Sequence, residues 1–140
     1  MAKFLLLKYY RGGPAPVGAP LIGATPEEMQ AHQDHMGVLN TELMERGEFV
    51  DAQGLAPTGT WVRGDGPDGA PVTDGPFAET KDLIAGFWIV DVESEQRAHE
   101  IAARGSAAPG KDGAYVNDWI EVRPIMSEAP ATMDELFDQL

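Results

Sequence analysis

The fold is decided by the stretch Leu83-Ile84-Ala85-Gly86-Phe87-Trp88-Ile89-Val90-Asp91-Val92, the most apolar run of the sequence. Its length and its aromatic and β-branched residues predict a strand. Successive side chains of a strand point to opposite faces, and both faces are apolar here, with Trp88 on one and Phe87 on the other. A sheet that contains such a strand must be covered on both sides.

The elements around this strand define the fold class. Residues 3–10 predict a second strand that is apolar on both faces, and the Pro- and Gly-rich residues 11–23 predict a loop. The further elements predicted are a helix after Thr25, a strand at 48–55, a hairpin at 57–73, a helix at 94–104 that Gly105 ends, and a strand at 119–125. This order is typical of an α+β, ferredoxin-like β-α-β-(hairpin)-β-α-β sandwich.

The first helix has the strongest local signals. Thr25 is placed to cap it, Pro26 occupies its first position, and Glu28 can close a capping box. Apolar residues then recur at spacings of three and four, so they share one face with His32. Residues 1–126 are thus predicted to form one α+β domain. Residues 127–140 form a tail with a short amphipathic helix capped by Thr132.

The two strands with two apolar faces predict that another protein chain covers part of the sheet. The two helices of a ferredoxin-like sandwich cover one face of its sheet, and no predicted segment remains to cover the other. A second copy of the chain is the economical cover, so the sequence predicts a homodimer in which two sheets form an α+β barrel.

Composition excludes several classes of partner. The 140 residues are enough for one domain, and the net charge is −13, with 10 basic and 23 acidic residues. Such a surface repels nucleic acid and anionic membranes. The chain has no cysteine, and its apolar N-terminal run is too short for a signal peptide. We therefore expect a cytoplasmic protein without thiol chemistry.

His32 is the first candidate for chemistry. It lies on the apolar face of the first helix, where a polar ring needs a partner. It is either a general acid or base or a core histidine bonded to a backbone carbonyl. Glu28 and His35 lie beside it at helical spacing, which would suit a metal site on this helical face. A clear third ligand is missing, however, and Glu28 is explained by the capping box. We predict no metal and no cofactor.

Asp74 is the second candidate, in the stretch Asp74-Gly75-Pro76-Phe77-Ala78-Glu79-Thr80-Lys81. The proline restricts the backbone after the carboxylate, which suits either a positioned catalytic group or a turn aspartate bonded to nearby amides. Phe77 is expected to pack on the core or to roof a pocket. His32 and Asp74 are the predicted catalytic pair, and their proximity is the condition for it.

Further residues are expected to bind a ligand on the face away from the helices. Asp51 and Arg123 lie there if the strands alternate regularly, and Arg123 could clamp a carboxylate or pair with Glu121. Tyr9 and Trp119 could line the same cavity or simply belong to the core.

The stretch 74–81, with its flanking Val72-Thr73 and Gly86-Phe87, resembles the motif of the DGPF-domain branch of the YCII-related family. Glu121-Val122-Arg123-Pro124 is similar to the last strand of that family, and the resemblance covers roughly residues 3–126. It implies a dimeric α+β barrel, in which relatives are suspected of using a His and Asp pair. The resemblance also implies a link to sigma factors, which often accompany such proteins.

Two functions follow as hypotheses. The first is a small-molecule-binding protein that acts as a cofactor-independent isomerase, lyase or hydrolase-like enzyme, with His32 and Asp74 in general acid-base catalysis. The second is a non-catalytic accessory or sensing protein, as the association with sigma-factor regulation implies. Fold analogy cannot select between them, because this scaffold supports many chemistries.

Overall fold

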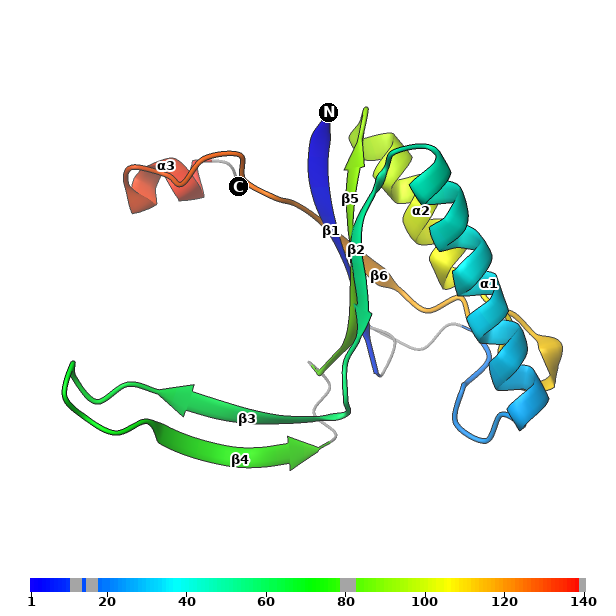
Figure 1. Cartoon of the computed structure of the whole chain (residues 1–140), viewed down its shortest axis with the longest axis horizontal. Helices are drawn as coiled ribbons and strands as arrows, with labels where there is room; N and C mark the ends of the chain where they lie inside the picture. Colours follow the sequence, from blue (N-terminus) through cyan, green and yellow to red (C-terminus); the bar gives the residue numbers. More distant parts are fainter. Residues whose placement is uncertain (11–13, 15–17, 79–82, 139–140) are drawn as a thin grey trace.

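The computed structural model of the chain describes residues 1–10, 14, 18–78 and 83–138. Four antiparallel strands form one sheet in the order β2-β5-β1-β6. Two helices, α1 and α2, cover one face of it (Figure 1). The bounds are β1 Ala2–Tyr9, α1 Pro26–Glu45, β2 Phe49–Gly54, β5 Ile84–Val92, α2 Glu95–Ser106 and β6 Ile120–Pro124. This arrangement confirms the predicted ferredoxin-like α+β fold, whereas the dimeric barrel stays a prediction.

Helix α1 begins as its sequence predicts. The Thr25 hydroxyl accepts a hydrogen bond from the amide of Glu28 at 3.1 Å, and the Glu28 carboxylate accepts one from the amide of Thr25 at 2.9 Å. The capping box thereby pairs two backbone amides at the helix start, with Pro26 at the first helical position. The helix ends at Glu45, and Gly47 reverses the chain with a φ of 71°.

The core lies between the sheet and the two helices. The helix-facing side chains of β1 and β5 form it together with one face of α1 and of α2. The buried members are Phe4, Leu6, Leu39, Leu43, Trp88, Val90, Val92, Ala98, Ile101 and Ala102. Because β1 and β5 pair along almost their whole length, their inward side chains meet in register.

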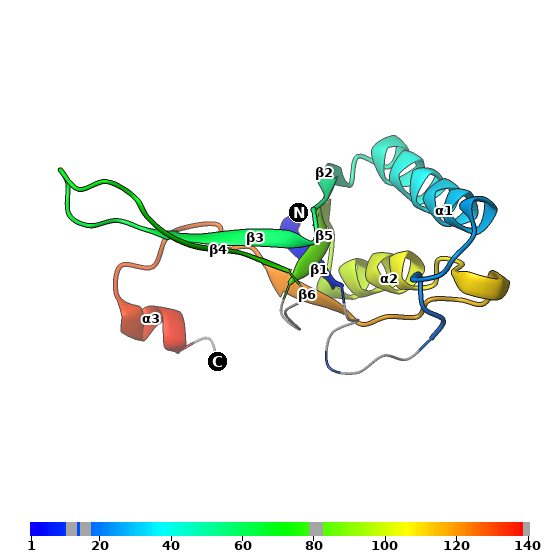
Figure 2. The same ribbon diagram turned by 90° about the horizontal axis from the view of Figure 1, so that it is seen from below.

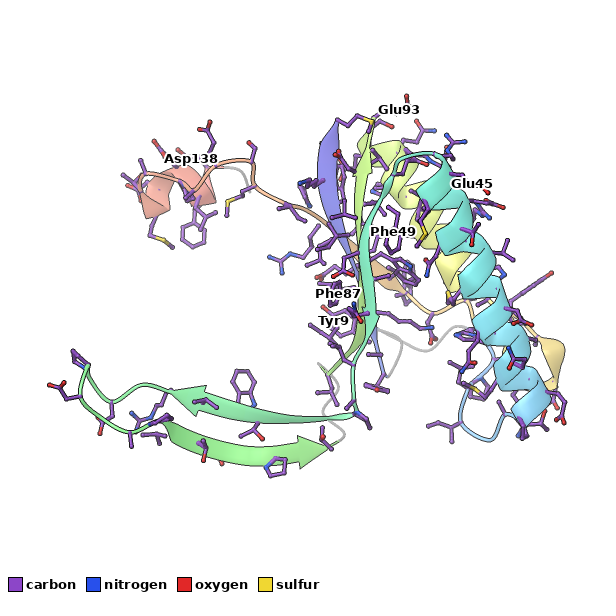
Figure 3. All side chains as sticks on the ribbon, in the orientation of Figure 1. Tyr9, Glu45, Phe49, Phe87, Glu93 and Asp138 are labelled. Atoms are coloured by element: carbon purple, nitrogen blue, oxygen red, sulfur yellow. The ribbon has the colours of Figure 1, made fainter. Side chains whose placement is uncertain are left out.

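The opposite face of the sheet carries the second apolar set. Figure 3 shows Tyr9 and Phe87 on this face, with Phe49 on the helix side. Leu7 on the central strand β1 is buried, whereas Phe87 and Ile89 are only half-buried. We call this surface, made of the outward side chains of the four strands, the open face.

Strand β2 departs from the expected alternation. Phe49 pairs with Val90 and Asp51 pairs with Ile89, so the register shifts between them and Val50 is the extra residue. The shift sends Phe49 and Ala52 to the core and Asp51 to the open face. A regular alternation would place Phe49 and Asp51 on one face, and the extra residue Val50 separates them.

Helix α2 also departs from expectation, because Gly105 does not end it. Ser94 caps the helix, its hydroxyl accepting from the amide of Arg97 at 3.1 Å. The helix continues to Ser106, and Gly105 is buried within it. A Cβ on Gly105 would lie 3.2 Å from the Trp88 ring, so the glycine allows close packing on the sheet rather than a stop.

The inserted hairpin is longer than predicted. Strands β3 (Thr58–Arg63) and β4 (Val72–Ala78) pair only with each other among the described strands. Asp74 pairs with Trp61 inside β4, so it lies in a strand and not in the turn that the sequence suggested. The hairpin projects from the sheet on the side away from α1 and α2 (Figures 1 and 2).

The two remaining helical segments are short. A 3-10 turn, η1 (Lys111–Gly113), lies in the loop between α2 and β6. Helix α3 (Met133–Phe137) follows β6 and is capped by Thr132, whose hydroxyl accepts from Glu135 at 3.2 Å. Met133 and Phe137 are exposed, and the tail lies on the same side of the sheet as the hairpin (Figure 2).

Candidate functional site

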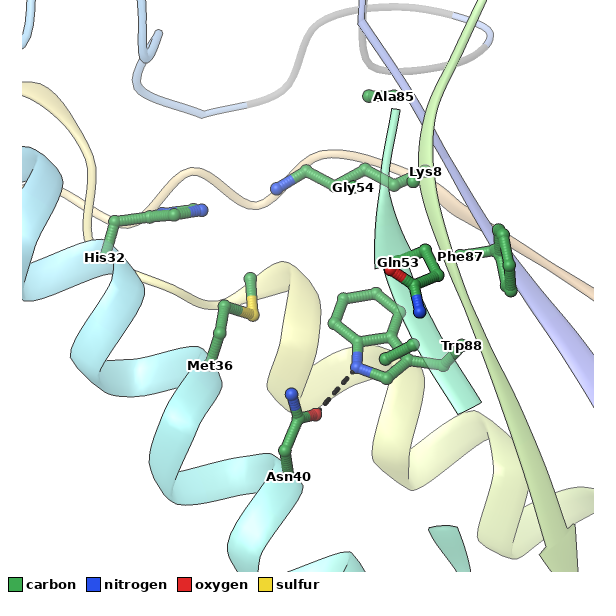
Figure 4. A pocket seen from close by; sticks show the side chains of 11 residues that line it. Lys8, His32, Met36, Asn40, Gln53, Gly54, Ala85, Phe87 and Trp88 are labelled. Carbon is green, nitrogen blue, oxygen red and sulfur yellow. Dashed lines mark hydrogen bonds between the residues drawn. The ribbon is translucent and has the colours of Figure 1, made fainter. Parts of the chain in front are cut away.

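A cleft of about 250 Å³ opens between α1 and the helix-facing side of the sheet. Figure 4 shows its lining from the two sides: His32, Met36 and Asn40 from α1, and Lys8 and Trp88 from the sheet. The remaining lining residues are Ala52, Gln53, Gly54, Ala85, Gly86 and Phe87. Charged and aromatic groups therefore converge on one concave surface, which is typical of a small-molecule site.

His32 is the most enclosed polar group of the cleft, with 7% of its surface exposed. Its Nδ1 lies 2.9 Å from the backbone carbonyl oxygen of Pro109. A carbonyl oxygen only accepts hydrogen bonds, so Nδ1 carries the proton and Nε2 is left as an acceptor. The bond to a backbone carbonyl that is expected of a core histidine is thus present. The same bond also fixes the tautomer that a general base needs.

The surroundings keep His32 neutral. Burial lowers the pKa of the imidazole, and the positive charge of Lys8 lowers the pKa further, while the bond to Pro109 partly opposes both. A ring whose pKa lies below its ordinary value of about 6.5 is unprotonated at pH 7. His32 can therefore accept a proton through Nε2 at neutral pH.

Lys8 was not singled out by the sequence analysis. It follows Phe4 and Leu6 on the helix-facing side of β1, and its side chain runs toward the ring of His32 (Figure 4). Burial lowers the pKa of its ammonium group, and the carboxylate of Asp118 partly opposes this. A lysine that follows Phe4 and Leu6 on an otherwise apolar face of the strand was the signal that could have identified it.

The floor of the cleft is fixed by a hydrogen bond between a helix and the sheet. The indole Nε1 of Trp88 donates to Oδ1 of Asn40 at 2.9 Å, drawn as a dashed line in Figure 4. Asn40 lies eight residues after His32, so two turns of α1 present both side chains to the sheet. The bond joins α1 to β5 at the cleft.

The structure does not bring Asp74 to His32 within one chain. Asp74 is exposed on β4, and the hairpin lies on the side of the sheet opposite to α1 (Figure 1). Phe77 also belongs to β4, but its side chain lies outside the described part of the chain. The pairing of His32 with Asp74 thus stays a prediction, and one chain alone does not provide it.

Three predicted ligand-binding residues lie on the open face rather than in the cleft. The Tyr9 hydroxyl donates to Glu121 at 3.3 Å, and Arg123 lies 4.0 Å from the same carboxylate with 67% of its side chain exposed. Asp51 accepts from the amide of Ala52 at 2.8 Å. These bonds satisfy the polar groups locally. Tyr9, Asp51 and Arg123 lie on one face, and their role in binding a ligand stays a prediction.

Trp119 does not share that surface. It precedes β6 and lines a second hollow, of about 480 Å³, with Ala102 and Ser106 of α2. More than half of Trp119 is exposed. The expectation that Trp119 and Tyr9 line one cavity was wrong, because the chain has not yet entered the regular alternation of β6 at residue 119.

Two other polar side chains of α1, those of His35 and Glu28, are committed to structural bonds. His35 donates through Nε2 to the carbonyl oxygen of Arg104 at 2.7 Å, and Glu28 accepts from the amide of Asp112 besides closing the capping box. Across residues 1–10, 14, 18–78 and 83–138, no three acidic or histidine side chains converge as metal ligands. No helix in these ranges combines the length and the apolar content needed to cross a membrane.

Comparison with known proteins identifies the family. The sequence model of the YCII-related domain matches residues 2–127. The chain belongs to the YCII-related family. A YCII-related identity agrees with the α+β fold and leaves α3 and its flanks beyond the match.

A curated relative of this YCII-related protein comes from Rhizobium meliloti (strain 1021). It is 39% identical over 62 residues, which are 44% of this chain, and it is named only as an uncharacterised protein. The match spans 46% of the relative, so this chain aligns with about half of its length. Family membership therefore provides the fold, and the chemistry must be argued from the cleft.

Proposed function

We propose that this YCII-related protein binds a small molecule in the cleft beside α1 and that His32 exchanges a proton with it. The observation that carries the proposal is the bond from Nδ1 of His32 to the carbonyl of Pro109, which leaves Nε2 as a neutral acceptor. Such a group removes a proton from a ligand and returns it, as an isomerase, lyase or hydrolase-like enzyme requires.

We also propose the homodimer. The open face carries buried Leu7 and half-buried Phe87, and the hairpin and tail both project on its side (Figure 2). An isolated two-stranded hairpin is marginally stable in water, so a second copy between hairpin and tail would support it. If His32 and Asp74 act together, they do so across the two copies.

Titration of the His32 ring by NMR tests the acid-base role, with His32→Gln to assign its signals. We expect a neutral ring at pH 7 with the proton on Nδ1 and a pKa below the ordinary value. A ring protonated at pH 7, or one with the proton on Nε2, contradicts the proposal.

Asp74→Asn tests the cross-copy pair separately. A nearby carboxylate raises a histidine pKa, so removing it should lower the pKa of His32. An unchanged pKa contradicts the pair. Light scattering after size-exclusion chromatography tests the dimer, and a monomer at micromolar concentration contradicts it.

The second candidate function is a non-catalytic accessory protein. The exposed side chains of Met133 and Phe137 on α3 favour it, because a short helix with an exposed apolar side gains stability by docking. Deleting residues 127–140 discriminates between the two functions. Loss of a protein partner with ligand binding intact favours the accessory role.

A further inference from the structure

The cleft contains a cation that none of the described residues neutralises at contact distance. The ammonium group of Lys8 has no hydrogen-bond acceptor and no ion-pair partner among the described residues. Asp118 acts on it only through longer-range attraction. Removing an ammonium from water without a partner is costly, so a lysine kept in this position implies a negative ligand group.

The other groups at the cleft do not provide that negative charge. His32 faces Lys8 as a neutral ring, and the oxygen of the Asn40 amide is already bonded to Trp88. Met36 and the Trp88 ring make the adjoining walls apolar. The cleft therefore has one positive point beside an apolar surface.

Volume limits the size of what fits. The cleft volume of about 250 Å³ lies just below the range of about 300–1,000 Å³ that is usual for ligand pockets. This room suits a compact molecule. A single ammonium matches one negative charge, since a doubly charged phosphate requires more donors than the cleft offers.

We infer that the cleft takes a small monocarboxylate with an apolar body, and that Lys8 is the residue that binds its carboxylate. The inference rests on the proposed function, because the same cleft holds His32. It transfers the role of anion anchor from Arg123, which lies on the open face beside Glu121, to Lys8. The ligand body then lies against Met36 and Trp88, within reach of Nε2 of His32.

The overall charge of the protein restricts where a small carboxylate can bind. A net charge of −13 repels small anions from most of the surface, so carboxylate binding has to come from a local cation. The attraction should also persist in about 0.1 M salt, because a partly buried pair is screened less than an exposed one.

The test is an NMR titration of the full-length chain with phenylacetate as the probe and phenylacetamide as its neutral analogue of the same shape. Phenylacetate should shift the signals of Met36 and Trp88 and bind roughly tenfold or more tightly than the amide. Lys8→Met, which keeps the apolar stem, should weaken phenylacetate binding roughly tenfold or more. Lys3→Met is the matched control, since Lys3 lies exposed on the same strand, and should leave binding within about twofold.

Three results overturn the inference: equal binding of acid and amide, equal binding to the wild type and Lys8→Met, or no shifts in the cleft at tens of millimolar phenylacetate. The His32 ring separates this inference from the proposed function. Binding that needs Lys8 but leaves the ring signals unchanged supports the carboxylate site and contradicts the role of His32. Binding that shifts the ring but is equal in Lys8→Met contradicts the carboxylate site alone. Circular dichroism of Lys8→Met establishes that the variant is folded.

Discussion

Replacing Glu48 by Gln should destabilise the fold more than any other removal of a charge that we consider. Glu48 precedes β2 with 6% of its surface exposed. Its Oε1 accepts from Arg46 at 2.7 Å and from Arg97 at 2.9 Å, while its Oε2 accepts from the Nε of Arg97 at 2.9 Å. The bidentate contact with Arg97 lowers the pKa of Glu48 and joins α2 to the start of β2.

The magnitude follows from the group left behind. Glu48→Gln removes the countercharge of Arg97, only 13% of whose side chain is exposed. Removing one partner of a buried ion pair costs about 3–5 kcal/mol. The remaining contact of Arg97 with Glu100, at 3.3 Å, compensates in part, so we expect a loss of about 3 kcal/mol. With an m-value of about 2 kcal/mol/M, the urea midpoint should fall by about 1.5 M.

Glu100→Gln is the matched control. It removes one charge from the same arginine, but 54% of the Glu100 side chain is exposed, so the loss should stay below about 1 kcal/mol. Urea unfolding of both variants at pH 7 and equal protein concentration measures the difference. If Glu48→Gln costs less than about 1 kcal/mol, or no more than Glu100→Gln, the buried pair does not hold the helix and strand together.

Three further predictions concern the packing of the helices and the ring of His32. Gly105→Ala should lower the free energy of unfolding by about 1–3 kcal/mol because its Cβ would meet Trp88 at 3.2 Å. Gly37→Ala, on an open surface of α1, should raise it by about 0.5–1 kcal/mol, and equal effects in urea unfolding would refute the packing argument. Trp88→Phe should cost about 1–3 kcal/mol because it leaves the Asn40 oxygen unpaired, and a thermal midpoint equal to that of the wild type would contradict this. The pKa of His32 is lowered in the folded chain, so on acidification the unfolded chain takes up a proton first. The free energy of unfolding should therefore fall as the pH drops below about 6.5. His32→Gln should reduce this slope, and an identical slope would exclude the ring as its source.

Local sequence signals predicted those parts of the fold that depend on local chemistry. The Thr25 to Glu28 capping box placed the start of α1, because both bonds lie within four residues. Alternation predicted a strand at residues 3–10 with two apolar faces, and β1 accordingly buries Leu6 against the helices and Leu7 on the open face. The element order then provided the topology.

The errors arose where tertiary packing overrides local preference. A register shift at Val50 puts Phe49 on the core face although Asp51 faces the other way, and no residue type marks such a bulge. Glycine commonly ends helices, but Gly105 instead allows α2 to pack closely against Trp88. Both features depend on a neighbour that is distant in sequence.

Only part of the candidate site could be predicted from the sequence. His32 followed from helical spacing, whereas the carbonyl of Pro109 that orients it lies 77 residues away in a loop with no periodicity. Lys8 was not singled out from the sequence, because its role depends on α1, which brings the ring of His32 opposite it (Figure 4). Asp74 was predicted as a catalytic residue from the motif at residues 74–81. The hairpin places it on the side of the sheet opposite to α1 (Figure 1).

The bond between His32 and Pro109 has a consequence for how the protein tolerates change over evolution. The acceptor that holds the imidazole is a main-chain oxygen, which every amino acid at position 109 would supply. Side-chain replacements at that position therefore leave the orientation of the ring intact, provided that the loop keeps its path. The proton acceptor in the cleft is thus insulated from mutational drift in the residue that positions it.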